Sequence, residues 1–250
     1  MNVIYIVLAG WVSSLVGGIV GLGGGFILIP ILTLILGWDD KDAIFISITS
    51  IFVLALLKNH KNRALIKTHR QLLIPLALFS ILGSGLFTLV LNVTPSLYLA
   101  RGFAVLMIGV GLFFLVDKNP EALIDAKKDP IWKMRLAIFL SGALSGLFGV
   151  GGGIINVPIL HKIKRFDMKT AANLSFFFIF ISSLAAIITQ LQVRRAAIDQ
   201  IPISYLVAIM TGTMLGFYTN RFVPLGNHGI KRLFAILVIF VGVSKLWGSL

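Results

Sequence analysis

The sequence contains no cysteine and few charged residues, and each shortage excludes a class of protein. Without cysteine the chain has neither disulfides nor thiolate metal sites. Asp, Glu, Lys and Arg make up 12% of the 250 residues, whereas 58% are hydrophobic and the mean hydropathy is +0.99. A water-soluble domain cannot cover so much apolar side chain, so the composition predicts an all-α polytopic membrane protein.

Carboxylates are the scarcest charged groups, and none lies inside an apolar run. The nine are Asp39, Asp40, Asp42, Asp117, Glu121, Asp125, Asp129, Asp167 and Asp199. A carrier of cations or protons usually keeps an acid at membrane depth, so this absence favours a neutral or anionic substrate. With no buried His, Cys or carboxylate for general acid–base or metal chemistry, we expect no enzyme, no metal and no cofactor.

The excess of basic residues is explained by a membrane. A net charge of +13 would suggest a nucleic-acid ligand in a soluble protein. Here, however, Lys and Arg occupy short loops between apolar runs, which is the pattern that orients membrane helices. We therefore expect a lipid bilayer around the chain and no nucleic-acid partner, while the sequence leaves the oligomeric state open.

One glycine-rich stretch occurs twice. Residues 21–25 (GLGGG) recur 128 positions later at 149–153 (GVGGG), and a proline follows each copy, Pro30 or Pro158. At the same spacing the matching pairs are Ala43 with Ala171, Ser47 with Ser175, and Asn92 with Asn220. The chain is therefore two copies of one unit. We place the first repeat at 1–116, a cytoplasmic linker at 117–135 and the second repeat at 136–250.

Charge counting chooses between two topologies. Six apolar runs are long enough to cross a membrane: 42–57, 71–91, 97–116, 170–191, 201–220 and 233–248. The runs that flank the glycines either cross as kinked pairs, making eight spans, or enter the membrane and return. With eight spans, thirteen Lys and Arg residues lie on one side of the membrane and nine on the other. With six spans the numbers are seventeen and five. Because Lys and Arg collect on the cytoplasmic side, six spans are favoured, with both termini extracytoplasmic and the two repeats inverted.

The glycine stretches are the candidate site. Glycine inside an apolar run gives access to positive φ and close backbone approach, so we expect 21–25 to leave helical geometry near the midplane. A short helix then starts around Ile27, with Pro30 in its first turn, and its free N–H groups face an anion. The alternative is that the glycines only allow close helix packing. The candidate substrate-binding residues are Gly21, Gly23, Gly24, Gly25, Pro30, Ser47, Gly149, Gly151, Gly152, Gly153, Asn156, Pro158, Asn173 and Ser175.

The doubled GxGGGxxxxPxL pattern, followed on the next helix by Ala43 and Ser47 or by Ala171 and Ser175, resembles the sulfite exporter TauE/SafE family. The resemblance covers nearly the whole chain. It implies a multi-pass transporter of the plasma membrane, the inner membrane in a cell that has two, that moves sulfite, sulfonates or related sulfur-containing anions, often outward.

These observations together predict a transporter that moves a small anion by alternating access. Backbone N–H groups of the two stretches would bind the anion, and Ser47, Asn156, Asn173 and Ser175 would complete its shell. A passive anion channel would use the same residues. An intramembrane enzyme or an assembly factor is the alternative from another class.

Overall fold

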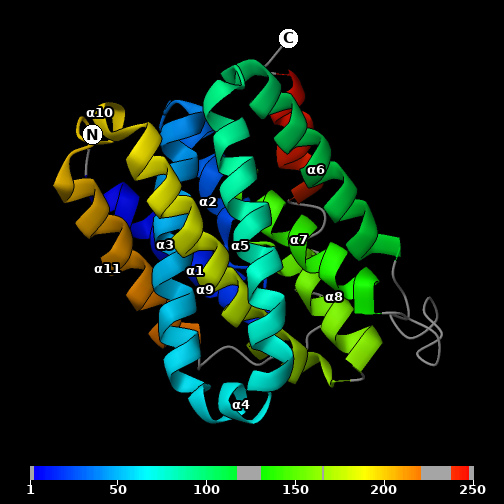
Figure 1. Cartoon of the computed structure of the whole chain (residues 1–250). Coiled ribbons are helices and arrows are strands. Elements are labelled where there is room, and N and C mark those ends of the chain that lie inside the picture. The colour runs from blue at the N-terminus through cyan, green and yellow to red at the C-terminus, as the bar shows by residue number, and fades with distance from the viewer. Residues whose placement is uncertain (1–2, 117–130, 165, 221–237, 248–250) are drawn as a thin grey trace.

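The computed structural model describes residues 3–116, 131–164, 166–220 and 238–247, and every regular element in these residues is helical (Figure 1). The first half contains α1 (Val3–Val20), α2 (Gly25–Pro30), the π-helical turn η1 (Ile31–Ile35), α3 (Asp40–Lys61), α4 (Arg63–Thr68), α5 (Arg70–Val93) and α6 (Ser96–Val116). The second half contains α7 (Ile131–Phe148), α8 (Gly153–Lys164), α9 (Met168–Val193), α10 (Arg195–Ile198), α11 (Ile203–Thr219) and a C-terminal helix at Val238–Trp247. The predicted all-α fold is confirmed.

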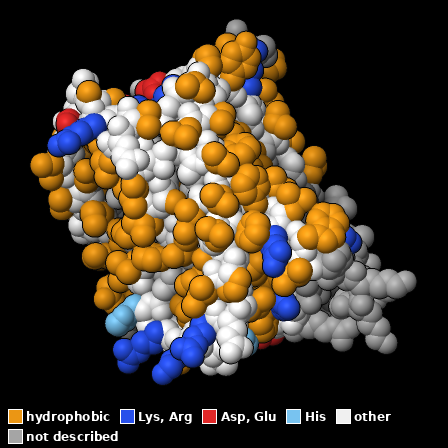
Figure 2. All heavy atoms as spheres, in the orientation of Figure 1, with side chains coloured by type: hydrophobic (Ala, Val, Ile, Leu, Met, Phe, Trp, Pro, Cys, Tyr) orange, Lys and Arg blue, Asp and Glu red, His pale blue; other side chains and the backbone are white. Residues whose placement is uncertain are grey.

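The helices have the length and surface of a membrane protein. Within the described residues, four helices are long and apolar enough to cross a membrane, namely α3, α5, α7 and α9, and shorter apolar helices accompany them. Large hydrophobic side chains lie exposed along their outer faces (Figure 2). On α5, for example, Ile74, Leu78 and Leu86 are 62%, 56% and 52% exposed. Such a surface is stable only against lipid.

The division into repeats stays a prediction. Helix α7 begins at Ile131, inside the segment expected as the linker, and residues 117–130 of that linker lie outside the described residues. The start of the last expected span, at 233–237, also lies outside them.

Two long helix pairs hold the halves together, and both pairs run parallel. In the first pair the backbone of α11 touches that of α1, because a β-carbon at Gly212 would lie 2.1 Å from Val7 O and one at Gly216 would lie 2.5 Å from Trp11 O. Residue numbers rise together in the two helices, so they point the same way. Glycines four residues apart allow this close approach, as in other membrane helix pairs.

The second pair, α5 with α7, repeats this packing. A β-carbon at Gly142 would lie 2.3 Å from Ser80 O, and one at Gly146 would lie 2.3 Å from Ser84 O. Each half therefore contributes its first helix to one pair and its later long helix to the other. This exchange of helices is what a pseudo-two-fold axis between the repeats requires.

The contacts also show how the repeats are aligned. A β-carbon at Gly216 would meet the Trp11 carbonyl and the Leu15 N–H, and one at Gly83 would meet the carbonyl and N–H of the matching residues Phe139 and Ala143. Gly216 therefore corresponds to Gly83, at a spacing of 133 rather than 128.

The predicted match of Asn92 with Asn220 is consequently wrong. The second half has gained residues before α11, because α9 has 26 residues and its counterpart α3 has 22. The extra turn at the end of α9 shifts everything after it.

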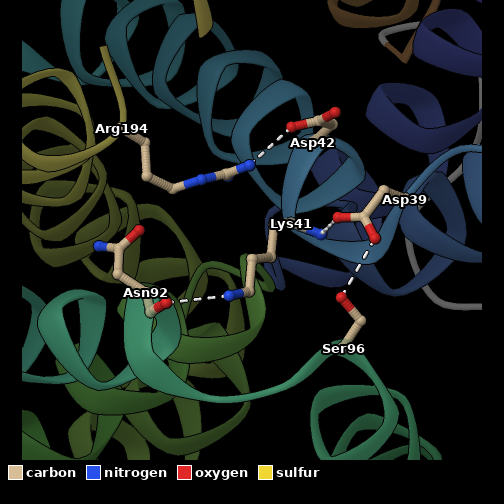
Figure 3. A network of polar contacts seen from close by, with 6 residues as sticks. All are labelled: Asp39, Lys41, Asp42, Asn92, Ser96 and Arg194. Carbon is tan, nitrogen blue, oxygen red and sulfur yellow. Dashed lines mark hydrogen bonds and ion pairs between the residues drawn. The ribbon is translucent and has the colours of Figure 1, made fainter. Parts of the chain in front are cut away.

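The start of α3 marks one face of the bundle. We call this face the α10 face, because α10 also lies there. Four contacts join the start of α3 to the terminal residues of other helices, and Figure 3 shows all of them except the pair of Lys245 with Asp40. They are Lys41 Nζ donating to Asn92 O at 2.9 Å, Ser96 Oγ donating to Asp39 at 3.1 Å, Arg194 paired with Asp42 at 2.8 Å, and Lys245 paired with Asp40. The ends of α5, α9 and the C-terminal helix and the starts of α3 and α6 thus share this face.

Both glycine-interrupted pairs enter the bundle and return to the face they came from. Helix α11 starts on the α10 face after α10, so its parallel partner α1 also enters there, and the chain returns there at Asp39 to begin α3. Helix α5 starts beside α4 at the opposite end, the α4 face, so α7 enters from the α4 face (Figure 1). Helix α8 then returns to the α4 face, where α9 begins. These contacts agree with re-entrant pairs that enter from opposite faces, while the six-crossing inverted arrangement stays a prediction.

Matching acidic caps begin the two helices that follow the re-entrant pairs. The side chain of Asp39 accepts a hydrogen bond from the Lys41 N–H at the start of α3, and Asp167 accepts one from the Thr170 N–H at the start of α9. Hydrogen bonds from the side chain and backbone of Thr170 lower the pKa of the Asp167 carboxyl below its usual value. The caps lie 128 residues apart, so both repeats start this helix in the same way.

Candidate functional site

The two glycine stretches leave helical geometry at matching residues. Positive φ angles occur at Gly21 (80°), Gly23 (91°), Gly24 (92°), Gly149 (63°), Gly151 (86°) and Gly152 (64°). Side chains rarely adopt this region of φ, which explains why glycine fills these positions. The predicted break in the helix is confirmed in both repeats.

Each glycine stretch folds back against the middle of the helix that precedes it. A β-carbon at Gly24 would lie 2.4 Å from Ser13 O, and one at Gly152 would lie 2.5 Å from Ser141 O. Ser13 and Ser141 are in the middle of α1 and α7, respectively. Helices α2 and α8 therefore begin near the centre of the bundle and run outward to opposite faces.

The two stretches touch each other across the centre. A β-carbon at Gly25 would lie 2.1 Å from Gly149 O, and one at Gly153 would lie 2.3 Å from Gly21 O. Each repeat therefore places its last glycine against the first glycine carbonyl of the other repeat. No residue larger than glycine fits at these contacts.

Two matching serines bind these same carbonyls. Ser47 Oγ on α3 donates to Gly149 O at 2.7 Å. Ser175 Oγ on α9 lies 3.2 Å from Gly21 O and 2.8 Å from Ala172 O. Both serines are fully buried. The Ser47 hydroxyl thus donates to the opposite repeat, whereas the Ser175 hydroxyl lies closer to Ala172 O of its own helix than to Gly21 O of the opposite repeat. Both serines therefore lie at the contact between the two halves.

Three backbone N–H groups in each stretch have no acceptor among the described residues. Those of Gly23–Gly25 and Gly151–Gly153 donate no hydrogen bond to any described residue, whereas the Gly24 and Gly152 carbonyls accept from the turns that follow. The first N–H groups of a helix have no partner within it, and they carry the positive end of its dipole. These six N–H groups therefore belong to the two stretches that lie close to the middle of α1 and of α7.

The proline lies later in the short helix than we predicted. Helix α2 begins at Gly25, so Pro30 is its last residue and not part of its first turn. The π-helical turn η1 follows directly, with the Leu36 N–H donating to Ile31 O. Proline has no N–H to donate along the helix, and the wider turn accommodates this loss. In the second repeat Pro158 lies at the corresponding sixth position of α8, which continues as an α-helix.

Asn156, in the first turn of α8, has no side-chain hydrogen bond to any described residue. Its side chain is fully buried, and neither the amide oxygen nor the amide nitrogen has a hydrogen bond within the described structure. An unpaired buried amide costs about 1–3 kcal/mol. The matching residue in the first repeat is Leu28, which is 1% exposed. The last candidate, Asn173, is only half-buried on α9.

Sequence reasoning missed the serines that pack against the stretches. Ser13 and Ser141 press against Gly24 and Gly152, and the Ser141 hydroxyl donates to Gly152 O at 3.0 Å. Their spacing of 128 residues is a signal that would have identified them.

The comparisons with known proteins agree with this architecture. The family model described as sulfite exporter TauE/SafE matches residues 6–244. The chain belongs to this family. A probable membrane transporter protein of Methanocaldococcus jannaschii is 27% identical over 97% of the chain and 93% of its own length, and one of Bacillus subtilis is 26% identical over 99% and 98%. TauE/SafE family protein 1 of Arabidopsis thaliana is 48% identical over 28% of the chain and 16% of its own length. No solved structure matches the chain.

Membership makes this TauE/SafE protein a membrane transporter and supports the prediction that it is not an enzyme. It also supports a small-molecule substrate and a bilayer environment.

Proposed function

We propose that this TauE/SafE protein moves a small sulfur-containing oxyanion, such as sulfite or a small organosulfonate, across the plasma membrane by alternating access. The anion would bind where α2 and α8 begin, to backbone N–H groups of the two glycine stretches and to the Asn156 amide. The unpaired donors at the centre carry this proposal. The name of the family suggests sulfur chemistry and outward transport.

The sign of the substrate charge follows from what surrounds the donors. Every described carboxylate lies near an end of a helix, at Asp39, Asp40, Asp42, Asp167 or Asp199. No negative side chain within the described residues therefore repels an anion at depth. Each hydrogen bond to a charged group contributes about 1.5–3 kcal/mol, so a few N–H donors replace much of the hydration of the anion.

The contact between the stretches favours a carrier over an open channel. Gly25 against Gly149 O and Gly153 against Gly21 O leave no space between the two backbones. An anion at this level must part the halves before it passes. Because the two repeats differ in orientation, parting them toward one face or the other gives two states of one structure.

Flux into proteoliposomes tests this function. The purified protein is reconstituted and supplied with radiolabelled sulfite, thiosulfate, sulfate and a small sulfonate, with and without a pH gradient. We expect saturable flux of at least one sulfur oxyanion. Flux that never saturates would indicate the channel, and transport of Na⁺ or a neutral solute without any oxyanion would overturn the proposal.

A further inference from the structure

A basic cavity opens on the α4 face, next to the end of α1. It has a volume of about 410 Å³, and its lining includes Lys58, His60 and Lys61 from the end of α3 together with Phe217 and Asn220 from the end of α11. No carboxylate is among the described residues that line it. Its volume is within the range of small-molecule pockets, about 300–1,000 Å³.

Lys58 is the cation that connects this cavity to the glycine stretch. Its Nζ donates to Gly18 O at 3.0 Å, three residues before Gly21. The same Nζ lies 5.5 Å from the ring centre of Phe176 and 5.9 Å from that of Phe217. The ammonium is therefore held between two aromatic rings at the point where the re-entrant chain turns back. His60 and Lys61 are exposed and lie farther out.

Satisfying the Gly18 carbonyl does not by itself require a charge. The matching carbonyl in the second repeat belongs to Gly146, and the uncharged hydroxyl of Thr88 donates to it at 3.3 Å. The residue that matches Lys58 is Ala186, which is fully buried. One repeat thus completes the same turn with a neutral donor. The ammonium at Lys58 needs a second explanation, and a basic cavity beside it provides one.

We infer that this cavity is an entry site for the anion, in which Lys58 is the inner ligand and Lys61 and His60 attract the anion from solution. The inference rests on the proposed function for the identity of the ligand, a divalent oxyanion. Burial between rings makes a charge at Lys58 act in a lower dielectric than a charge at the surface. Because the second repeat lacks the equivalent lysine, the entry site is present at one end of the path only. The α4 face is then the face from which substrate is loaded.

Binding of thiosulfate and of sulfate to the full-length purified protein tests this site, measured by calorimetry. Lys58→Gln keeps a donor for Gly18 O but removes the charge, and we expect binding about tenfold weaker or worse. Lys58→Arg keeps the charge and should bind within about threefold of the wild type. Lys61→Gln, at the rim, should weaken binding by less than Lys58→Gln. The matched control is Lys164→Gln, an exposed cation at the end of α8 outside the cavity, which should change nothing.

The results separate this inference from the proposed function. If Lys58→Gln and Lys61→Gln bind both anions as tightly as the wild type while the wild type carries them into proteoliposomes, the entry site is wrong and the transporter stands. If the wild type binds the anions in a manner that depends on Lys58 but carries none, the site stands and the proposed function fails. Should Lys58→Gln not fold, binding by Lys61→Gln that is as tight as binding by the wild type and by Lys164→Gln overturns the inference.

Discussion

Two glycines of the central stretches combine close packing with a left-handed backbone. A β-carbon at Gly24 would lie 2.4 Å from Ser13 O, and one at Gly152 would lie 2.3 Å from the Ser141 hydroxyl. Both positions also have positive φ. We expect Gly24→Val and Gly152→Val each to abolish transport, because the side chain displaces the start of the helix that holds the N–H donors. Flux into proteoliposomes measures this, with the amount of inserted protein determined alongside.

A glycine outside the stretches is the control for this prediction. Gly109 on α6 has open space where a β-carbon would be. Gly109→Val should therefore transport normally. Normal transport by both central variants as well would show that the stretches are not the substrate path.

The paired serines allow a milder test at the same scale. Ser47→Ala leaves Gly149 O, and Ser175→Ala leaves Gly21 O, without its hydroxyl donor. A buried carbonyl that loses its partner costs about 1–3 kcal/mol, so each variant should be less stable by that amount. Anion binding should weaken by about one to two decades if the hydroxyl also contacts the substrate. Thermal unfolding and calorimetry separate the two effects.

An aspartate at Ser175 gives a sharper test of the sign of the substrate charge. A carboxylate at this buried position would repel an anion in a low-dielectric site. Ser175→Asp should therefore lose anion flux while the protein still inserts. An inserted variant that keeps its flux would contradict an anionic substrate at this level.

Among the elements, the start of α3 is the one that closes the α10 face. Asp42 pairs with Arg194 at the end of α9, with side chains 34% and 14% exposed. A partly exposed pair of this kind contributes about 1 kcal/mol, which corresponds to about a fivefold change in an equilibrium between closed and open states. Asp42→Asn combined with Arg194→Gln should therefore open this face more often.

Labelling at a single cysteine detects this opening, since the chain has no cysteine of its own. A cysteine at Ile44, which is 2% exposed, should react several times faster with a membrane-impermeant maleimide in the double variant. Arg195→Gln is the control, because its pair with Asp199, at 4.0 Å, lies within the exposed α10 region. Equal labelling of the cysteine at Ile44 in the wild-type background, the double variant and Arg195→Gln would show that the pair of Asp42 with Arg194 does not close the path.

For the whole molecule, the distribution of charge predicts the orientation in the membrane. Lys and Arg side chains gather at the end of the molecule that carries α4, and Figure 2 shows this cluster. The positive-inside tendency then places α4 in the cytoplasm and both termini outside. A cysteine at Asp199 should be labelled in intact cells by an impermeant reagent, and one at Thr68 should not. A reporter fused after Leu250 that is active only in the cytoplasm would contradict this orientation.

The sequence by itself determined the class of protein, and it predicts the doubled unit and the inverted arrangement. The apolar composition and the placement of Lys and Arg between apolar runs can be read directly from the sequence, so they do not depend on which residues touch in the fold. The glycine stretches were visible for a related reason, since positive φ is a local backbone requirement that only glycine meets easily. A motif that recurs at a constant spacing carries this requirement into both halves.

Only the tertiary structure decided how the two halves meet. The hydrogen bond from Ser47 to Gly149 O joins residues 102 positions apart, and no local pattern encodes which carbonyl a buried hydroxyl reaches. The register of α11 is shifted by five residues, four of which are the extra length of α9, so the match of Asn92 with Asn220 was a coincidence of spacing. The place of Lys58 beside the end of α1 was likewise hidden, because a lysine at the end of an apolar run is also typical of a topology signal. Its contact with Gly18 O depends on the end of α1 lying beside the end of α3, which is a property of the folded chain.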